Sequence, residues 1–119
     1  MADDNDEIIE HIRSHFDESN QDLKTVVDTE VCKRLRLGRQ RYGHGVRVNA
    51  DVSQWTENKK DDWLSMAYEE FYDGMIYLSA EYLRLKRSST QRKDRMDNID
   101  IAMKSLISGI DALRESIAL

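Results

Sequence analysis

The chain has 119 residues, 34% of them charged, with a formal net charge of -5, a balance that argues against nucleic acid as a general partner. Cys32 is the only cysteine, so an internal disulfide is excluded, and no apolar run approaches the roughly 20 residues of a membrane span. We therefore expect one cytoplasmic domain over residues 1–119 with no membrane contact.

The composition favours helices, because proline is absent and only five glycines interrupt the chain. Residues 5–17 place Ile8, Ile9, Ile12 and Phe16 at helical spacing, which predicts a short first helix. A longer second helix is expected from Asp22 to about Arg41, capped by Ser19 or Asn20.

The second helix is expected to stop in "RYGHG", where two glycines allow backbone angles that other residues avoid. Residues 46–62 show no sustained periodicity, although "VRV" suggests a brief extended piece. An ordered loop of this length is unusual in a small domain, so we expect it to have a functional role.

Two further helices are predicted, from about Asn58 to Lys86 and from about Arg92 to the end. In the last one, an alternating three-four spacing of apolar residues is typical of bundle packing: Met96, Ile99, Met103, Leu106, Ile110, Leu113 and Ile117. The predicted fold is an all-α bundle of about four helices, with a long loop between the second and the third.

Three acids in the third helix, Glu69, Glu70 and Asp73, interrupt a run of aromatic and aliphatic residues. At about 100° per residue they lie opposite the broad apolar stripe of the helix, as in an ordinary solvated face. Their own side of the helix, however, also carries Met66, Ile76, Tyr77 and Ala80. A helix that is apolar nearly all round is usually buried on both sides, so we expect these carboxylates to be buried and to need a partner.

A metal ion would satisfy such a cluster. Carboxylates one helical turn apart project side by side and suit a hard cation, Mg²⁺ or Mn²⁺. No imidazole or thiolate joins the three acids, which argues against zinc.

The same stretch resembles a known family. "EEFYDGMIYL" is similar to the acidic helix of the MazG-like all-α nucleoside triphosphate pyrophosphohydrolases, which carry Glu-x-x-Glu on one helix and Glu-x-x-Asp on the next. The match is Glu70-x-x-Asp73 preceded by Glu69, and "RQRYGHGVRV" followed by "DW" resembles small viral and bacterial members. The resemblance covers about residues 30–85. It implies Mg²⁺-dependent or Mn²⁺-dependent conversion of a (d)NTP to (d)NMP and pyrophosphate by a homodimer or homotetramer, with Glu69, Glu70 and Asp73 in the catalytic site.

The second acidic pair that this resemblance requires is not evident. We favour Asp97 and Asp100 in the fourth helix, because Asp100 flanks the apolar seam. The alternatives are Asp28 with Glu30, or Asp51 with Glu57. The acids of the fourth helix also fit a simpler interpretation, in which they complement the positive end of the helix dipole.

Substrate contacts are expected around the predicted loop. Arginines and lysines there would neutralise a triphosphate, Trp55 would stack on a base, and Asn58 would contact a base edge or cap a helix. The candidate substrate-binding residues are Arg36, Arg39, Arg41, His44, Arg47, Trp55, Asn58, Lys59 and Lys60. The simpler interpretation is that these cations are solvated near a helix C-terminus and that Trp55 anchors the loop.

A second function class remains open. The apolar seam of the last helix, together with the lack of a clear second acidic pair, also fits a non-catalytic module for helical oligomerisation or interaction. In that case the acids are surface or interface charges.

Overall fold

The computed structural model describes residues 3–52, 62–90 and 92–116. All regular structure in these ranges is helical, as predicted, and no strand occurs in them. No helix in the described part is long and apolar enough to cross a membrane. The chain forms two compact units, Met1–Ala50 and Asp51–Leu119, which are described separately below. The prediction of a single domain over the whole chain stays a prediction.

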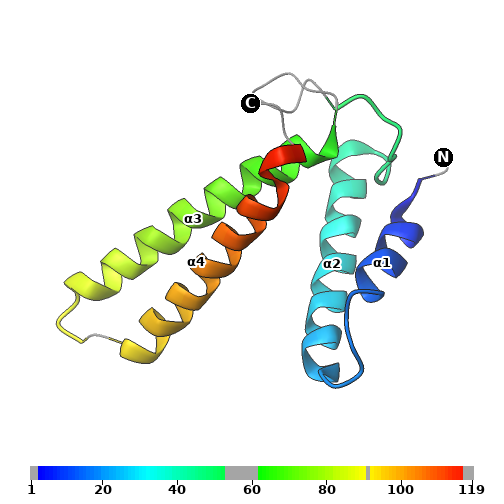
Figure 1. Ribbon diagram of the computed structural model, residues 1–119. Helices are drawn as coiled ribbons and strands as arrows, with labels where there is room; N and C mark the ends of the chain where they lie inside the picture. Colours follow the sequence, from blue (N-terminus) through cyan, green and yellow to red (C-terminus); the bar gives the residue numbers. More distant parts are fainter. Residues whose placement is uncertain (1–2, 53–61, 91, 117–119) are drawn as a thin grey trace. The chain divides into compact units, whose positions relative to one another are not determined.

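The first unit consists of α1 (Asn5–Arg13) packed on α2 (Gln21–Tyr42) (Figure 1). The predicted cap of the second helix is confirmed as Asn20, whose side chain accepts a hydrogen bond from the backbone N–H of Leu23. The helix ends at Gly43, which adopts a left-handed φ of 78° and donates its N–H to the Arg39 carbonyl.

Helix α1 is four residues shorter than the predicted range of 5–17. Beyond Arg13, the backbone N–H groups of His15 and Phe16 donate to the carbonyls three residues earlier, so the chain tightens into a turn. Phe16 is half-buried without belonging to the helix. Its apolar side chain explains why the periodicity extends past the end of α1.

The second unit is a helical hairpin. Helix α3 (Trp63–Arg87) lies alongside α4 (Lys93–Leu113), and η2 (Arg114–Ser116) follows (Figure 1). Asp62 caps α3, since its side chain accepts from the Ser65 N–H at 2.6 Å. The predicted start of this helix near Asn58 lies outside the described residues. Helix α4 begins at Lys93 and ends at Leu113, so it is shorter than predicted.

The two helices of the hairpin are antiparallel, and close contacts define how they align. A Cβ built on Gly109 would lie 3.2 Å from Phe71, and one on Gly74 would lie 3.4 Å from Leu106. Near the turn of the hairpin, Glu81 of α3 pairs with Arg95 of α4 at 3.4 Å. The core includes Tyr68, Leu85 and Ile99, each under a tenth exposed. The apolar stripe of α3 and the apolar seam of α4 therefore face each other.

Candidate acidic site on helix α3

The three acids singled out in the sequence lie on the outer face of α3, the side of the helix turned away from α4. Glu70 and Asp73 are exposed, and Glu69 is half-buried. Neither Glu70 nor Asp73 forms an ion pair with any described residue. Glu70 and Asp73 are three residues apart, which places their carboxylates side by side across one turn.

The apolar residues beside these acids are exposed as well. Ile76 is 62% exposed and Tyr77 is 70% exposed, while Ala80 is also open and Met66 is half-buried. The expectation that the acids are buried is wrong for the α3–α4 unit taken by itself. The physical reason is that α4 covers only the opposite side of α3. The outer face of α3 thus combines the carboxylates of Glu70 and Asp73, which have no ion pair with the described residues, with uncovered apolar side chains.

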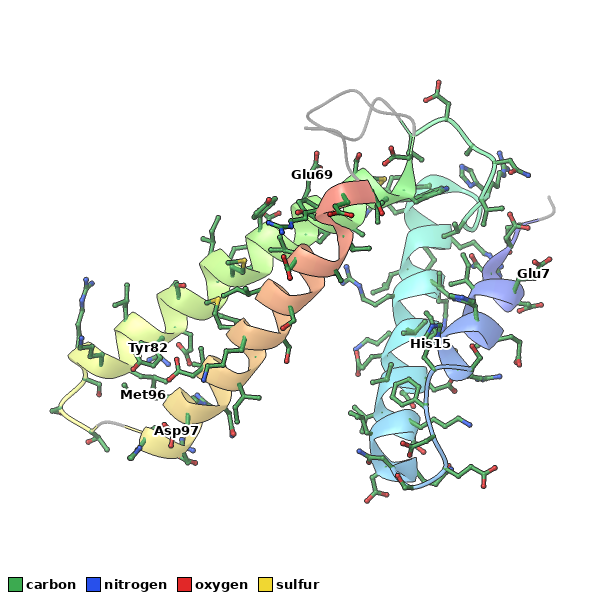
Figure 2. All side chains as sticks on the ribbon, viewed as in Figure 1. Glu7, His15, Glu69, Tyr82, Met96 and Asp97 are labelled. Carbon is green, nitrogen blue, oxygen red and sulfur yellow. The ribbon has the colours of Figure 1, made fainter. Side chains whose placement is uncertain are left out.

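The predicted second acidic pair lies at the other end of the hairpin. Figure 2 shows Glu69 near the start of α3 and Asp97 in the first turns of α4. The contact of Phe71 with Gly109 places Glu70 level with about residue 109. At a rise of about 1.5 Å per residue, Asp97 is therefore about 18 Å from Glu70 along the hairpin. One hairpin alone does not bring Asp97 to the acids of α3.

Asp97 and Asp100 differ in their surroundings. Asp97 is exposed and pairs with Lys93 one turn earlier, at 3.2 Å. Asp100 is exposed at the flank of the apolar seam of α4, and it lies about 10 Å along the hairpin axis from the level of Asp73. Asp97 lies near the N-terminus of α4. It therefore suits the simpler interpretation, in which acids there complement the helix dipole.

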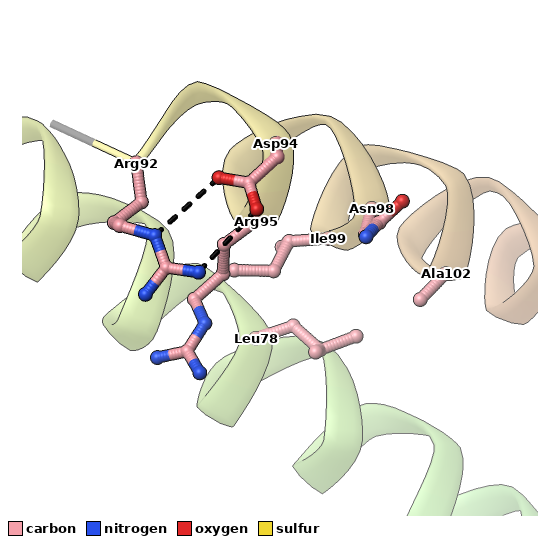
Figure 3. Close-up of a pocket in the computed structure, with 7 residues that line it drawn as sticks. All are labelled: Leu78, Arg92, Asp94, Arg95, Asn98, Ile99 and Ala102. Carbon is pink, nitrogen blue, oxygen red and sulfur yellow. Dashed lines mark hydrogen bonds and ion pairs between the residues drawn. The ribbon is translucent and has the colours of Figure 1, made fainter.

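A shallow depression of about 400 Å³ lies where α4 begins, against α3 (Figure 3). Its charged groups are already engaged: Arg92 pairs with Asp94 at 3.3 Å, and Arg95 pairs with Glu81 of α3 at 3.4 Å. The hydrogen bond from Arg92 lowers the pKa of the Asp94 carboxyl below its ordinary value. This depression is distant from the acids on the outer face of α3.

Of the alternative second acidic pairs, Asp28 has another role in the structure. Asp28 accepts from the Nε of Arg13 at 2.6 Å, and this bond lowers the pKa of the Asp28 carboxyl. Glu30 is exposed on α2, and Asp51 is exposed at the start of the second unit. Glu57 lies outside the described residues. Asp28 therefore holds α1 to α2 through an arginine.

The predicted substrate-binding residues divide into two groups. Arg36 and Arg41 are exposed on α2, and Arg39 pairs with Asp3 at 2.7 Å. His44 donates from Nδ1 to the Gly45 carbonyl at 2.7 Å, and Arg47 is half-buried. The other group, outside the described residues, comprises Trp55, Asn58, Lys59 and Lys60.

A set of contacts at the N-terminus holds the glycine-containing turn. Asn5 is buried, and its Oδ1 accepts from the Val46 N–H at 2.8 Å. Asp4 donates its N–H to the Val46 carbonyl and accepts from the Val48 N–H. Neither Asp4 nor Asn5 was among the candidate residues predicted from the sequence. The available signal was that Asp and Asn before a helix readily bind backbone groups.

Within the described ranges, no three or more histidine, cysteine, aspartate or glutamate side chains lie together as a metal-binding group. Comparison of the chain with protein-family models, with curated proteins and with solved structures found no match. The resemblance to the MazG-like family therefore stays a prediction. The arguments that follow use the residues of this chain.

Proposed function

We propose that the protein is a Mg²⁺-dependent or Mn²⁺-dependent nucleotide pyrophosphohydrolase that converts a (d)NTP to (d)NMP and pyrophosphate. The observation that supports it most is the pair Glu70 and Asp73, two exposed carboxylates one turn apart without an ion-pair partner among the described residues. Glu69 adds a third carboxylate beside them. These are the residues of the sequence that resemble the Glu-x-x-Asp signature.

The donor set fits the metal. Mg²⁺ is commonly bound by one or two carboxylates together with water and substrate phosphates, so a complete protein cage is not required. Glu70 and Asp73 would supply the carboxylate oxygens, with Glu69 as an additional ligand. A bound metal would supply charge neutralisation and an activated water for attack on the phosphoanhydride. Asp97 and Asp100 remain candidate ligands only where another chain presents them.

The triphosphate would require cationic groups in addition to the metal. Arg36 and Arg41 are exposed on α2 and free of ion pairs with the described residues, so their guanidinium groups are available to phosphate. Arg39 is committed to Asp3 in this structure. Arg36 and Arg41 therefore stay candidate phosphate ligands of the first unit.

The test is release of pyrophosphate from each (d)NTP in the presence of Mg²⁺ or Mn²⁺. We expect turnover with at least one nucleotide, and its loss in Glu70→Gln and in Asp73→Asn. Asp94→Asn is the matched control, since Asp94 is an exposed carboxylate with an arginine partner and is not a candidate metal ligand. No release from any nucleotide by folded protein would overturn the proposal, as would full activity in both variants of α3.

A second candidate function is favoured by a separate observation. The exposure of Ile76 and Tyr77 fits an interaction module in which α3 binds another helix. Under that hypothesis the carboxylates are interface charges, and metal should leave the melting temperature unchanged. A rise in melting temperature on adding Mn²⁺ would count against it, because a ligand that binds only the folded state stabilises that state.

A further inference from the structure

Charges and apolar residues follow a definite order along the outer face of α3. The acids Glu69, Glu70 and Asp73 occupy its first half. The apolar residues Ile76, Tyr77 and Ala80 occupy its middle. Arg84 and Arg87 lie near its end, and at about 100° per residue they share this face with the acids. The face is therefore acidic, then apolar, then basic.

Several charges at the two ends are available for contacts outside the hairpin, and Glu69 is not counted among them. Glu70, Asp73 and Arg87 form no ion pair with any described residue. Arg84 binds Glu81 on its own helix, but its side chain is 67% exposed. Exposed ion pairs of this kind contribute little to stability, so Arg84 can exchange partners at low cost.

We propose that the outer face of α3 is the surface on which a second copy of this chain packs, with the two α3 helices antiparallel. With a two-fold axis between Ile76 and Tyr77, the apolar residues of the two copies meet at the centre. The same axis brings Glu69 and Glu70 of each copy level with Arg84 of the other, and Arg87 lies one turn away. Asp73 then faces Ala80, whose side chain is small.

The order of the charges selects this orientation. A parallel pairing in register would place Glu70 against Glu70 and Arg84 against Arg84, which is repulsive at both ends. The antiparallel pairing makes both ends attractive and buries Ile76 and Tyr77. A self-complementary patch of this kind is what a two-fold symmetric dimer requires.

The outer side of α4 does not share this pattern, although it also exposes an isoleucine. Ile101 is 64% exposed, close to the 62% of Ile76. Its neighbours at helical spacing are polar, with Asp97 four residues before it and Ser105 four residues after it. A single apolar side chain on a polar surface is ordinary. Ile101 therefore provides a matched control.

This inference does not rest on the proposed hydrolase activity, because the pairing needs only side chains of the protein. The two proposals use Glu70 differently, and a metal ion held by Glu70 would compete with its pairing to Arg84. The oligomeric state should be measured in the presence of a metal chelator, so that metal binding at Glu70 and Asp73 does not affect the measured mass. Failure of the nucleotide assay would then leave the pairing intact, and a monomeric protein would leave the assay result unaffected.

The first experiment measures molar mass by light scattering over a series of protein concentrations. We expect a dimer for the unmodified chain, and a mass lower by half for Ile76→Glu and Tyr77→Glu at the same concentration. Ile101→Glu should remain dimeric, and circular dichroism should show the same helical signal in all variants. A monomeric parent chain would overturn the proposal. This is also the expected result if another part of the same chain covers the outer face of α3.

The second experiment tests the charge pairing. One variant carries Glu69→Lys and Glu70→Lys, and the other carries Arg84→Glu and Arg87→Glu. We expect each variant alone to dissociate and an equal mixture to form a heterodimer, since opposite charges then meet at both ends. A mixture that stays monomeric, or variants that each remain dimeric, would exclude the antiparallel pairing.

Discussion

Phe71 of α3 packs against the backbone of Gly109 in α4: a Cβ built on Gly109 would lie only 3.2 Å from Cε2 of the phenylalanine ring. The glycine thus provides the space that the ring occupies. This contact aligns the two helices and places Glu70 on the far side of α3. The alignment also separates Asp97 from the acids of α3.

Gly109→Val should destabilise the hairpin, because its methyl groups would collide with Phe71. Overpacking of a fitted contact typically costs about 1–3 kcal/mol. Urea unfolding followed by circular dichroism measures the effect, with Ser108→Val as the control, since Ser108 is exposed on the same helix. Equal stability of the two variants would show that the contact does not constrain the hairpin.

Tyr68 is the most buried aromatic residue of the described hairpin, at 4% exposed, and its hydroxyl donates to the Ile110 carbonyl at 3.4 Å. Tyr68→Ala should cost about 3 kcal/mol through the lost packing. Tyr68→Phe keeps the ring and removes only a long hydrogen bond, so its cost should stay below about 1 kcal/mol. Thermal unfolding of both variants compares these effects, and similar losses in both would contradict the packing argument.

The ion pair of Asp28 with Arg13 should make the first unit sensitive to acid. The hydrogen bond from Arg13 lowers the pKa of folded Asp28, whereas the unfolded carboxyl titrates near about 3.9. The stabilisation is therefore fully present above the unfolded value and is lost as the pH falls through the lowered pKa.

Asp28→Asn tests this dependence. The variant should be less stable at neutral pH and should lose less further stability on acidification to about pH 2. Urea unfolding at several pH values measures both effects. The control is Glu30→Gln, because Glu30 is exposed on the same helix and has no ion pair with the described residues. Identical acid sensitivity in the parent chain and Asp28→Asn would refute the assignment.

Two glycines of the first unit should respond to alanine with opposite signs. At Gly45 an added Cβ would lie 2.5 Å from the Asp3 carboxyl group, so Gly45→Ala should destabilise by about 1–3 kcal/mol. At Gly38, in α2, nothing lies within 4 Å, so Gly38→Ala should stabilise by about 0.5–1 kcal/mol. The midpoints of urea unfolding of the two variants are compared with that of the parent chain. A shift in the same direction in both variants would contradict the prediction.

Local chemistry determined much of the architecture. The lack of proline and the helical spacing of apolar residues predicted four helices. The side chain of Asn20 caps the start of α2, and Gly43, which has no Cβ, ends the helix with a positive φ. These features depend on neighbours within a turn or two of the chain. Asp62 was not singled out as the cap of α3, because Asn58, a residue of the same capping type, stands four positions earlier.

The sequence alone determined which residues share a face of a helix, because that follows from a period of 3.6 residues. It therefore placed Glu69, Glu70 and Asp73 beside Ile76 and Tyr77. Only the tertiary structure decided what covers each face and which residues of different helices stand at the same level. Those facts depend on long-range fit, such as Phe71 against Gly109, which leaves the acids of α3 uncovered and Asp97 at the opposite end of the hairpin.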